Sequence, residues 1–235
     1  MLTLTAEDYR LVFAKERQNV YPVVDAFEQK CGYWLDKGKV EMAAKVLACP
    51  IKKNPPNWQH GRVLYAAARA YLSHDAGISV LDIGTAKGFS ALCLQWALED
   101  SESIGLVTSV DIIDPTARVV RNTIAEVDGP VTLAETLAPW PEASQIRFVQ
   151  SEGLDWLRNH PERIHIAFVD GSHHAETVWK EGLYLADRQE PGDLAIFDDI
   201  DRVDITAAVA SLKHKYRFEY LEVLPNRHYA IGVRQ

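Results

Sequence analysis

The sequence predicts an α/β fold, in which a seven-stranded, mostly parallel sheet ends in an antiparallel hairpin and carries a helical cap at its N-terminus. From Ile78 onward, short apolar runs alternate with helical patterns, which is typical of a parallel sheet covered by helices on both faces. The last two alternating runs, Phe218–Val223 and Tyr229–Val233, are joined by a loop too short for a parallel crossover. Residues 1–75 have helical patterns and lack this alternation.

The N-terminal region, residues 1–75, is expected to cap the sheet, and residues 76–235 are expected to form the main domain. Thr5, followed by Asp8 three residues later, is typical of a helix start. Residues 52–57 read K-K-N-P-P-N, which predicts a loop, and residues 58–72 have the apolar spacing of a helix.

The elements of the main domain follow one another at short intervals. A helix after Pro115 is predicted to bury Ala117, Val120, Ile124 and Val127, and residues 131–145 are predicted to form an irregular connection. Further helices are expected after Gly88, around residues 154–157, from residue 175 and around residues 205–212. The expected parallel strands are Ile78–Ile83, Gly105–Ile112, Ile146–Gln150, Ile164–Val169 and Asp193–Phe197.

Composition narrows the class of protein. The 235 residues carry a net charge of −8 and no cluster of Lys or Arg, which argues against broad electrostatic binding to nucleic acid. The three cysteines have spacings that fit neither a disulfide framework nor a zinc site. The N-terminus lacks the pattern of a secretory signal, and no apolar run reaches the length of a membrane span, so a cytoplasmic protein is expected.

The stretch Val80–Ser90, V-L-D-I-G-T-A-K-G-F-S, reads as a strand, a tight glycine turn and the start of a helix. In an open α/β sheet, ligands bind where such turns leave the carboxyl ends of the strands. Thr85 stands where the dinucleotide-binding fingerprint needs its second glycine, which disfavours a nicotinamide-dependent dehydrogenase. A plain strand–helix turn without a ligand is the structural alternative.

This turn resembles the first motif of the class I S-adenosyl-L-methionine (SAM) methyltransferases, in particular the catechol-type and macrocin-type O-methyltransferases. The resemblance covers about residues 75–235 and implies a Rossmann-like fold with SAM as cofactor. It leaves the oligomeric state open between a monomer and a homo-oligomer. The residues of this motif that it implies in SAM binding are Asp82, Gly84, Thr85, Ala86, Gly88 and Ser90.

Residues after the second and third strands complete the expected SAM site. Asp111 can accept hydrogen bonds from both ribose hydroxyls of the adenosyl group; the alternative is a strand-end cap, and Asp114 competes for the ribose role. The resemblance implies that Ser151 and Glu152 contact the adenine. The family often has Gly-Asp-Ala where this chain has Ser-Glu-Gly, and Ser151 is equally suited to cap the next helix.

Three carboxylates are predicted to converge at the ends of the fourth and fifth strands. Asp170 ends one strand, and the pair Asp198 and Asp199 ends its expected neighbour, about 4.8 Å away. Like charges so placed raise one another's pKa unless a cation joins them, and oxygen ligands suit Mg²⁺ or Mn²⁺. The resemblance implies the same metal site. The alternatives are that Asp199 caps a helix or that Asp170 orients the SAM amino group.

His173 lies three residues after Asp170, where the resemblance implies the catalytic base; His174 is the adjacent alternative. The leading hypothesis is a metal-dependent, SAM-dependent O-methyltransferase acting on a small hydroxylated molecule. The alternatives are a metal-independent SAM methyltransferase with another N- or O-acceptor, including RNA, and a SAM-binding module without catalysis. In the leading hypothesis a metal lowers the pKa of the acceptor hydroxyl and His173 removes its proton.

Overall fold

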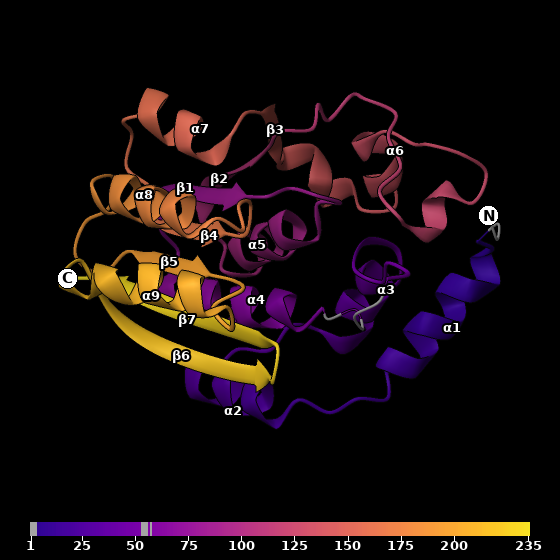
Figure 1. Ribbon diagram of the computed structural model, residues 1–235, viewed down its shortest axis with the longest axis horizontal. Helices are drawn as coiled ribbons and strands as arrows, with labels where there is room; N and C mark the ends of the chain where they lie inside the picture. Colours follow the sequence, from indigo (N-terminus) through magenta and orange to yellow (C-terminus); the bar gives the residue numbers. More distant parts are fainter. Residues whose placement is uncertain (1–3, 53–55, 57) are drawn as a thin grey trace.

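The computed structural model describes residues 4–52, 56 and 58–235 (Figure 1). Their strands form one seven-stranded sheet in the order β3-β2-β1-β4-β5-β7-β6. Strands β1 to β5 pair in parallel, whereas β7 runs antiparallel to both β5 and β6. This topology confirms the predicted fold class. The strands are β1 (Ala76–Ile83), β2 (Ile104–Asp111), β3 (Arg147–Gln150), β4 (Ile166–Val169), β5 (Leu194–Phe197), β6 (Tyr216–Leu224) and β7 (Arg227–Arg234).

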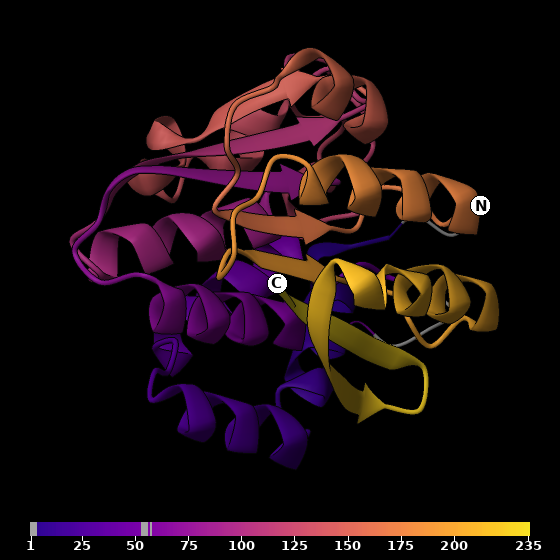
Figure 2. The same ribbon diagram turned by 90° about the vertical axis from the view of Figure 1, so that its left-hand side faces the viewer.

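Helices cover both faces of the sheet because the side chains of each buried strand alternate between the faces. In β1, Ile78 and Val80 join one apolar cluster, and Leu81 and Ile83 join the other. Figure 2 shows α8 and α9 on one side of the sheet and α4 and α5 on the other. The helices of the main domain are α5 (Phe89–Asp100), α6 (Leu133–Leu137), α7 (Gly153–Asn159), α8 (Ala175–Ala186) and α9 (Val203–Ser211), and its 3-10 turns are η1 (Ile124–Glu126), η2 (Pro141–Gln145) and η3 (Leu212–His214).

The N-terminal helices α2 to α4 contribute to the same apolar cluster as α5 and one face of the sheet. Thr5 caps the first helix as predicted, because its hydroxyl accepts the Asp8 N–H while the Asp8 carboxylate accepts the Thr5 N–H. None of the described helices combines the length and apolar character needed to cross a membrane. These helices are α1 (Ala6–Glu16), α2 (Pro22–Cys31), α3 (Lys37–Leu47) and α4 (Gln59–Tyr71).

The helix predicted after Pro115 does not form, and this expectation was wrong. The segment consists of turns with the short η1, and Val120 is 74% exposed instead of buried. Local side-chain bonds compete with a helix here, since Asp114 Oδ1 accepts the Thr116 N–H at 2.8 Å. Asn122 then takes a positive φ of 55° and bonds to both main-chain groups of Ile51, so this segment is anchored to the N-terminal region (Figure 1).

The connection over residues 131–145 is more regular than predicted. Thr132 and Glu135 form a capping box that starts α6, and Pro141 starts η2. The predicted strands lie in their correct places, with ends that shift by a few residues. The largest extension is at the C-terminal hairpin, where β7 begins at Arg227 in what was expected to be the connecting loop.

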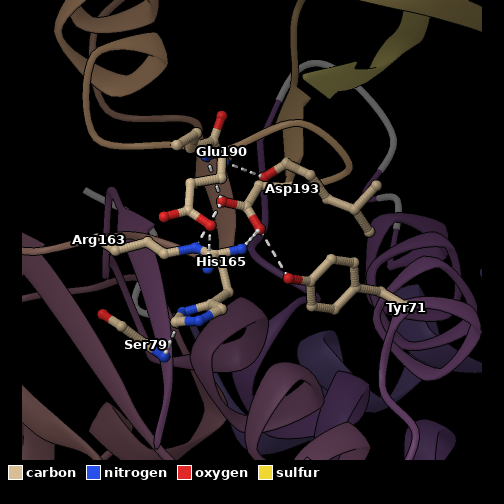
Figure 3. Close-up of polar contacts among 8 residues, drawn as sticks. Tyr71, Ser79, Arg163, His165, Glu190 and Asp193 are labelled. Atoms are coloured by element: carbon tan, nitrogen blue, oxygen red, sulfur yellow. Dashed lines mark hydrogen bonds and ion pairs between the residues drawn. The ribbon is translucent and has the colours of Figure 1, made fainter. Parts of the chain in front are cut away.

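A buried carboxylate holds together the edge of the sheet at which the parallel strands begin (Figure 3). Asp193 is fully buried; its Oδ1 accepts the Tyr71 hydroxyl at 2.7 Å and Arg163 Nη2 at 2.9 Å. Its Oδ2 accepts Arg163 Nε at 3.0 Å and the Glu190 N–H at 2.7 Å. Beside it, His165 Nδ1 accepts the Ser79 N–H at 3.1 Å. This network ties α4, β1 and the segments before β4 and β5.

Candidate functional site

The turn between β1 and α5 needs glycine for two different reasons. Gly84 has a φ of +104°, and a Cβ there would lie 2.7 Å from the carbonyl carbon of Asp170. Gly88 has a φ of +81° and precedes α5, whose first residue is Phe89. The first glycine therefore lets the ends of β1 and β4 approach closely, and the second lets the chain turn into the helix.

Thr85 is the residue that replaces the second glycine of a dinucleotide fingerprint. Its side chain is buried and links the turn to β1 and β2. Its hydroxyl lies 2.6 Å from the Ser109 hydroxyl, which donates to Asp82 Oδ2 at 2.6 Å. Burial raises the pKa of Asp82 to about 7. The other oxygen, Oδ1, is buried and has no hydrogen-bond partner in the described part of the chain. Asp82 thus lies under the turn with spare accepting capacity.

Asp111, at the end of β2, holds the turn from the side. Its Oδ2 accepts the Ala86 N–H at 2.8 Å, and its Oδ1 accepts the Ile113 N–H at 2.9 Å. A carboxylate oxygen has two lone pairs, so both atoms can still accept a further hydrogen bond. The cap-like contacts and the predicted ribose contact are therefore compatible. Asp114 instead bonds to its own neighbour Thr116.

A cavity of about 570 Å³ opens beside Asp111 and brings together the residues predicted to hold the adenosyl group. Gly84, Ser151 and Glu152 all line it, as do His173 and His174. The Ser151 hydroxyl donates to the Glu152 carbonyl at 2.9 Å, so it does not cap α7 through its side chain. This cavity extends from the glycine turn to the start of α7, and its lining combines apolar side chains with polar groups that could contact an adenosine.

A second, smaller cavity of about 170 Å³ lies on the other side of the turn. Gly84 lines both cavities, so they meet at the turn. Asp170 and Asp198 form one wall, and residues 47, 48 and 50 of the N-terminal region form another. Thr85, Ala86 and Ser90 also line it. The predicted donor-binding and acid residues therefore line one or other of these two cavities, except for Asp82, Gly88 and Asp199, which line neither.

The carboxylates of Asp170 and Asp198 follow neighbouring strands, because Val169 of β4 pairs with Phe197 of β5. Burial, followed by the charges of Asp198 and Asp199, raises the pKa of Asp170 well above its usual range. Burial and Asp199 raise the pKa of Asp198 to about 7. These carboxyl groups thus carry an excess of negative charge that favours a bound cation.

Asp199 links the predicted base to the guanidinium group of Arg227. His173 Nδ1 lies 2.8 Å from Asp199 Oδ2, and Arg227 Nη1 lies 2.9 Å from Asp199 Oδ1. Arg227 Nη1 also lies 3.9 Å from Asp198 Oδ2. Asp199 has a φ of 56°, a strained conformation for a residue other than glycine that turns the chain at the end of β5. His174 makes no comparable contact among the described side chains.

The acid cluster has the chemistry of a divalent-metal site but not its closed arrangement. Its donors are carboxylate oxygens, two of them on carboxyl groups with raised pKa values, which suits Mg²⁺. Among the residues that the structure describes, however, no group of three or more His, Cys, Asp or Glu side chains is positioned to hold a metal ion. Arg227 supplies positive charge beside Asp199 instead.

Comparison with protein-family models gives one decisive match. Residues 81–200, more than half of the chain, match the model of a family described as a methyltransferase domain. The chain belongs to this family. The matched range begins within β1 and ends just after the Asp198–Asp199 pair, so it includes the glycine turn, Asp111 and the acid cluster of this methyltransferase. The comparison with curated protein sequences gives no significant match.

Solved structures show the same fold at low sequence identity. An O-methyltransferase from Bacillus cereus in complex with S-adenosylhomocysteine (SAH) has a TM-score of 0.55 at 12% identity, over 92% of this chain and 93% of its own. The O-methyltransferase TomG from Streptomyces achromogenes, solved with SAM, has a TM-score of 0.57 at 16% identity, over 86% of this chain and 92% of its own. An rRNA methylase from Streptococcus thermophilus has a TM-score of 0.53 at 11% identity, over 74% of this chain and 95% of its own. Family and fold together support a SAM-dependent methyltransferase.

Several residues of the site were missed from the sequence of this methyltransferase. Arg227 was interpreted as part of a turn, and only the antiparallel return of β7 places it beside the acids. Glu181 of α8 lines the larger cavity with a buried oxygen that has no partner among the described residues. Lys52 and Lys87 line the smaller cavity. Lys87 lies within the glycine motif, which by itself indicates no role for its side chain. No motif marks the other residues, because their positions depend on how distant segments pack.

Proposed function

We propose that the protein is an O-methyltransferase that transfers the methyl group of SAM to a hydroxyl of a small molecule, with help from a divalent cation. His173 acts as the base, and Asp170, Asp198 and Asp199 hold Mg²⁺ or Mn²⁺. The observation that carries this proposal is the contact between His173 and Asp199 beside the acid cluster. Both lie at the carboxyl ends of β4 and β5, next to the turn where family and fold support SAM binding.

The geometry suits a base that is held by a carboxylate. When Nδ1 of His173 donates to Asp199, the imidazole has its lone pair on Nε2, which can accept a proton from an acceptor hydroxyl. The deprotonated oxygen then attacks the methyl carbon of SAM as the bond from sulfur to that carbon breaks, which releases SAH. The imidazolium formed at His173 is stabilised by Asp199 and returns its proton to solvent.

The donor is positioned by the residues around the glycine turn. Ribose hydroxyls can donate to Asp111, and the adenine lies toward Ser151 and Glu152 in the larger cavity. Asp82, whose buried Oδ1 has no partner in the described part of the chain, lies under the turn that holds the donor. A bound Mg²⁺ would lower the pKa of the acceptor hydroxyl and make its deprotonation easier near neutral pH.

A small acceptor fits the site better than RNA. The chain has a net charge of −8, which opposes binding of a polyanion, although rRNA methylases share the fold. The smaller cavity is walled by the N-terminal region, which restricts the space beside the acids. A cytoplasmic location belongs to the same proposal and is supported by three free cysteines.

A metal-independent reaction is the second candidate, and Arg227 favours it. Its guanidinium already compensates Asp199 and lies near Asp198, so the acids have a cation of their own. In this version His173 and Asp199 act as the base alone. A SAM-binding module without catalysis would retain the donor site but give no methylated product.

The test is a screen of hydroxylated small molecules in which SAH formation is measured with Mg²⁺, with Mn²⁺ and with a chelator. We expect turnover that requires the metal and is lost in Asp198→Asn, while SAH binding by calorimetry persists. Turnover that survives the chelator would establish the metal-independent version. SAH binding without turnover on any hydroxyl, amine or RNA acceptor would indicate the binding module.

A further inference from the structure

Two lysines line the smaller cavity without a counter-ion among the described residues. Lys52 follows α3, and Lys87 belongs to the glycine turn, so they reach the same space from opposite parts of the chain. In the described part of the chain, neither ammonium group has a hydrogen bond or an ion pair. Lys87 is partly buried and Lys52 is exposed. Two ammonium groups that line one cavity without an ion pair give it positive charge, which attracts an anion.

The charged groups around the lysines are of both signs. Arg227 pairs with Asp199 at 2.9 Å, and no ion pair joins either lysine to Asp170 or Asp198 in the described part of the chain. Burial and the charge of Lys52 lower the pKa of Lys87 to about 8. Desolvation and Arg227 lower the pKa of Lys52, although the three aspartates oppose this change. Lys87 is thus repelled by Lys52, while the repulsion of Lys52 by Arg227 is opposed by the three aspartates.

We propose that Lys52 and Lys87 bind an oxyanion, a carboxylate or a phosphate, that belongs to the methyl acceptor. The inference rests on the proposed function and narrows its substrate class to hydroxylated anions. The acceptor would place its hydroxyl toward Asp170 and Asp198 and its anionic group toward the lysines, which line the same cavity. An ammonium group is a compact charge that suits a carboxylate or a phosphate oxygen.

The carboxylate of SAM has the same chemistry and must be distinguished from an acceptor anion. Inorganic phosphate is the probe, titrated by calorimetry into the full-length protein loaded with SAH or with 5′-methylthioadenosine, which lacks the carboxylate. We expect phosphate to bind both complexes. Lys52→Met and Lys87→Met should each weaken this binding tenfold or more, because methionine keeps most of the length of the side chain without the charge.

The matched control is Lys213→Met, at an exposed lysine in η3 that lines neither cavity. It should leave the phosphate affinity unchanged, and thermal unfolding should confirm that all three variants fold. Phosphate that binds the methylthioadenosine complex but not the SAH complex would assign the lysines to the donor carboxylate and overturn the proposal. Absent phosphate binding, or binding that neither lysine variant weakens, would overturn it too. Failure of the wild type to bind SAH would instead contradict the proposed function, and phosphate binding to the unloaded protein would still test the lysines.

Discussion

His173 Nδ1 and Asp199 Oδ2 lie 2.8 Å apart, although they belong to loops after different strands. The contact holds the imidazole of an otherwise exposed histidine with Nε2 directed away from Asp199. Loss of the base in His173→Gln should lower turnover by about 10²- to 10⁴-fold. Loss of orientation in Asp199→Asn should cost on the order of 10- to 100-fold. Rates are measured as SAH formation with the acceptor identified by the screen.

The adjacent histidine supplies the control for this prediction. His174→Gln should leave turnover unchanged, because the described structure shows no polar partner for its ring. SAH affinity should be the same in His173→Gln, Asp199→Asn and His174→Gln, since these substitutions change groups that are proposed to act on the methyl acceptor and not on the donor. A His173→Gln protein that turns over at the wild-type rate would show that another group takes the proton.

Arg227 and a divalent ion should compete for the carboxylates of Asp198 and Asp199, and the metal affinity should measure this competition. Arg227 Nη1 lies 2.9 Å from Asp199 Oδ1, so Arg227→Met should raise the affinity for Mg²⁺ by at least about tenfold, about 1.4 kcal/mol. Asp198→Asn should remove binding. Calorimetric titration with Mg²⁺ measures both effects, and Arg217→Met on the neighbouring β6 is the control. The metal site is absent if neither the wild type nor Arg227→Met binds Mg²⁺.

Gly84→Ala should damage both stability and donor binding. The new Cβ would collide with the main chain at Asp170 and would require a φ of +104°, so we expect a loss of about 2–5 kcal/mol in the free energy of unfolding. SAH affinity should fall at least about tenfold, because both cavities meet at this residue.

Gly77→Ala separates the effect of the steric collision from the effect of the positive φ. Gly77 also has a positive φ, +75°, but a Cβ added there would meet no atom within 4 Å among the described residues, so only about 1–2 kcal/mol should be lost. Its SAH affinity should remain that of the wild type. Urea unfolding and calorimetry measure the two effects, and equal losses in both variants would argue against the steric explanation.

The fully buried Asp193 should be important for stability. Asp193→Ala leaves Arg163 and Tyr71 without their shared acceptor, and breaking such a buried pair costs about 3–5 kcal/mol. Glu190→Gln removes only an exposed ion pair with Arg163 and should cost less than about 1 kcal/mol. Urea unfolding at neutral pH compares the free energies of unfolding of the two variants. Similar losses would mean that the buried contacts of Asp193 contribute no more to stability than the exposed ion pair.

Acid should destabilise the fold through His165. Desolvation and the charge of Arg163 lower the pKa of His165 below 6.5, so the folded state binds fewer protons than the unfolded state as the pH falls through that value. The contribution of His165 to stability is therefore complete above about pH 6.5 and decreases below it.

His165→Asn isolates this effect, because its amide oxygen can still accept the Ser79 N–H but cannot titrate. Urea unfolding at several pH values gives the free energy of unfolding of both proteins. As the pH falls below about 6.5, the wild type should lose more stability than the variant. A difference between the two proteins that stays constant with pH would contradict this assignment.

The parallel strands could be predicted because apolar runs and glycine turns are local signals. Asp170 and Asp198 were likewise predictable neighbours, since each directly follows a strand. The segment after Pro115 was not predictable from its apolar spacing, because Asn122 bonds to Ile51, which is distant in the sequence. Arg227 was missed for a similar reason, as the register of β7 against β5 determines where its side chain lies.

The attachment of Asn122 constrains how the enzyme can be re-engineered. Besides Ile51, its Oδ1 accepts the Tyr9 hydroxyl at 3.1 Å, so one amide joins the first helix to the segment that follows Asp111. Exchanging the N-terminal helices for those of another enzyme would remove these hydrogen bonds of Asn122. The segment that follows Asp111, the residue proposed to bind the ribose, would then lose its attachment. A chimera intended to accept a new substrate should therefore transplant residues 112–132 together with the cap.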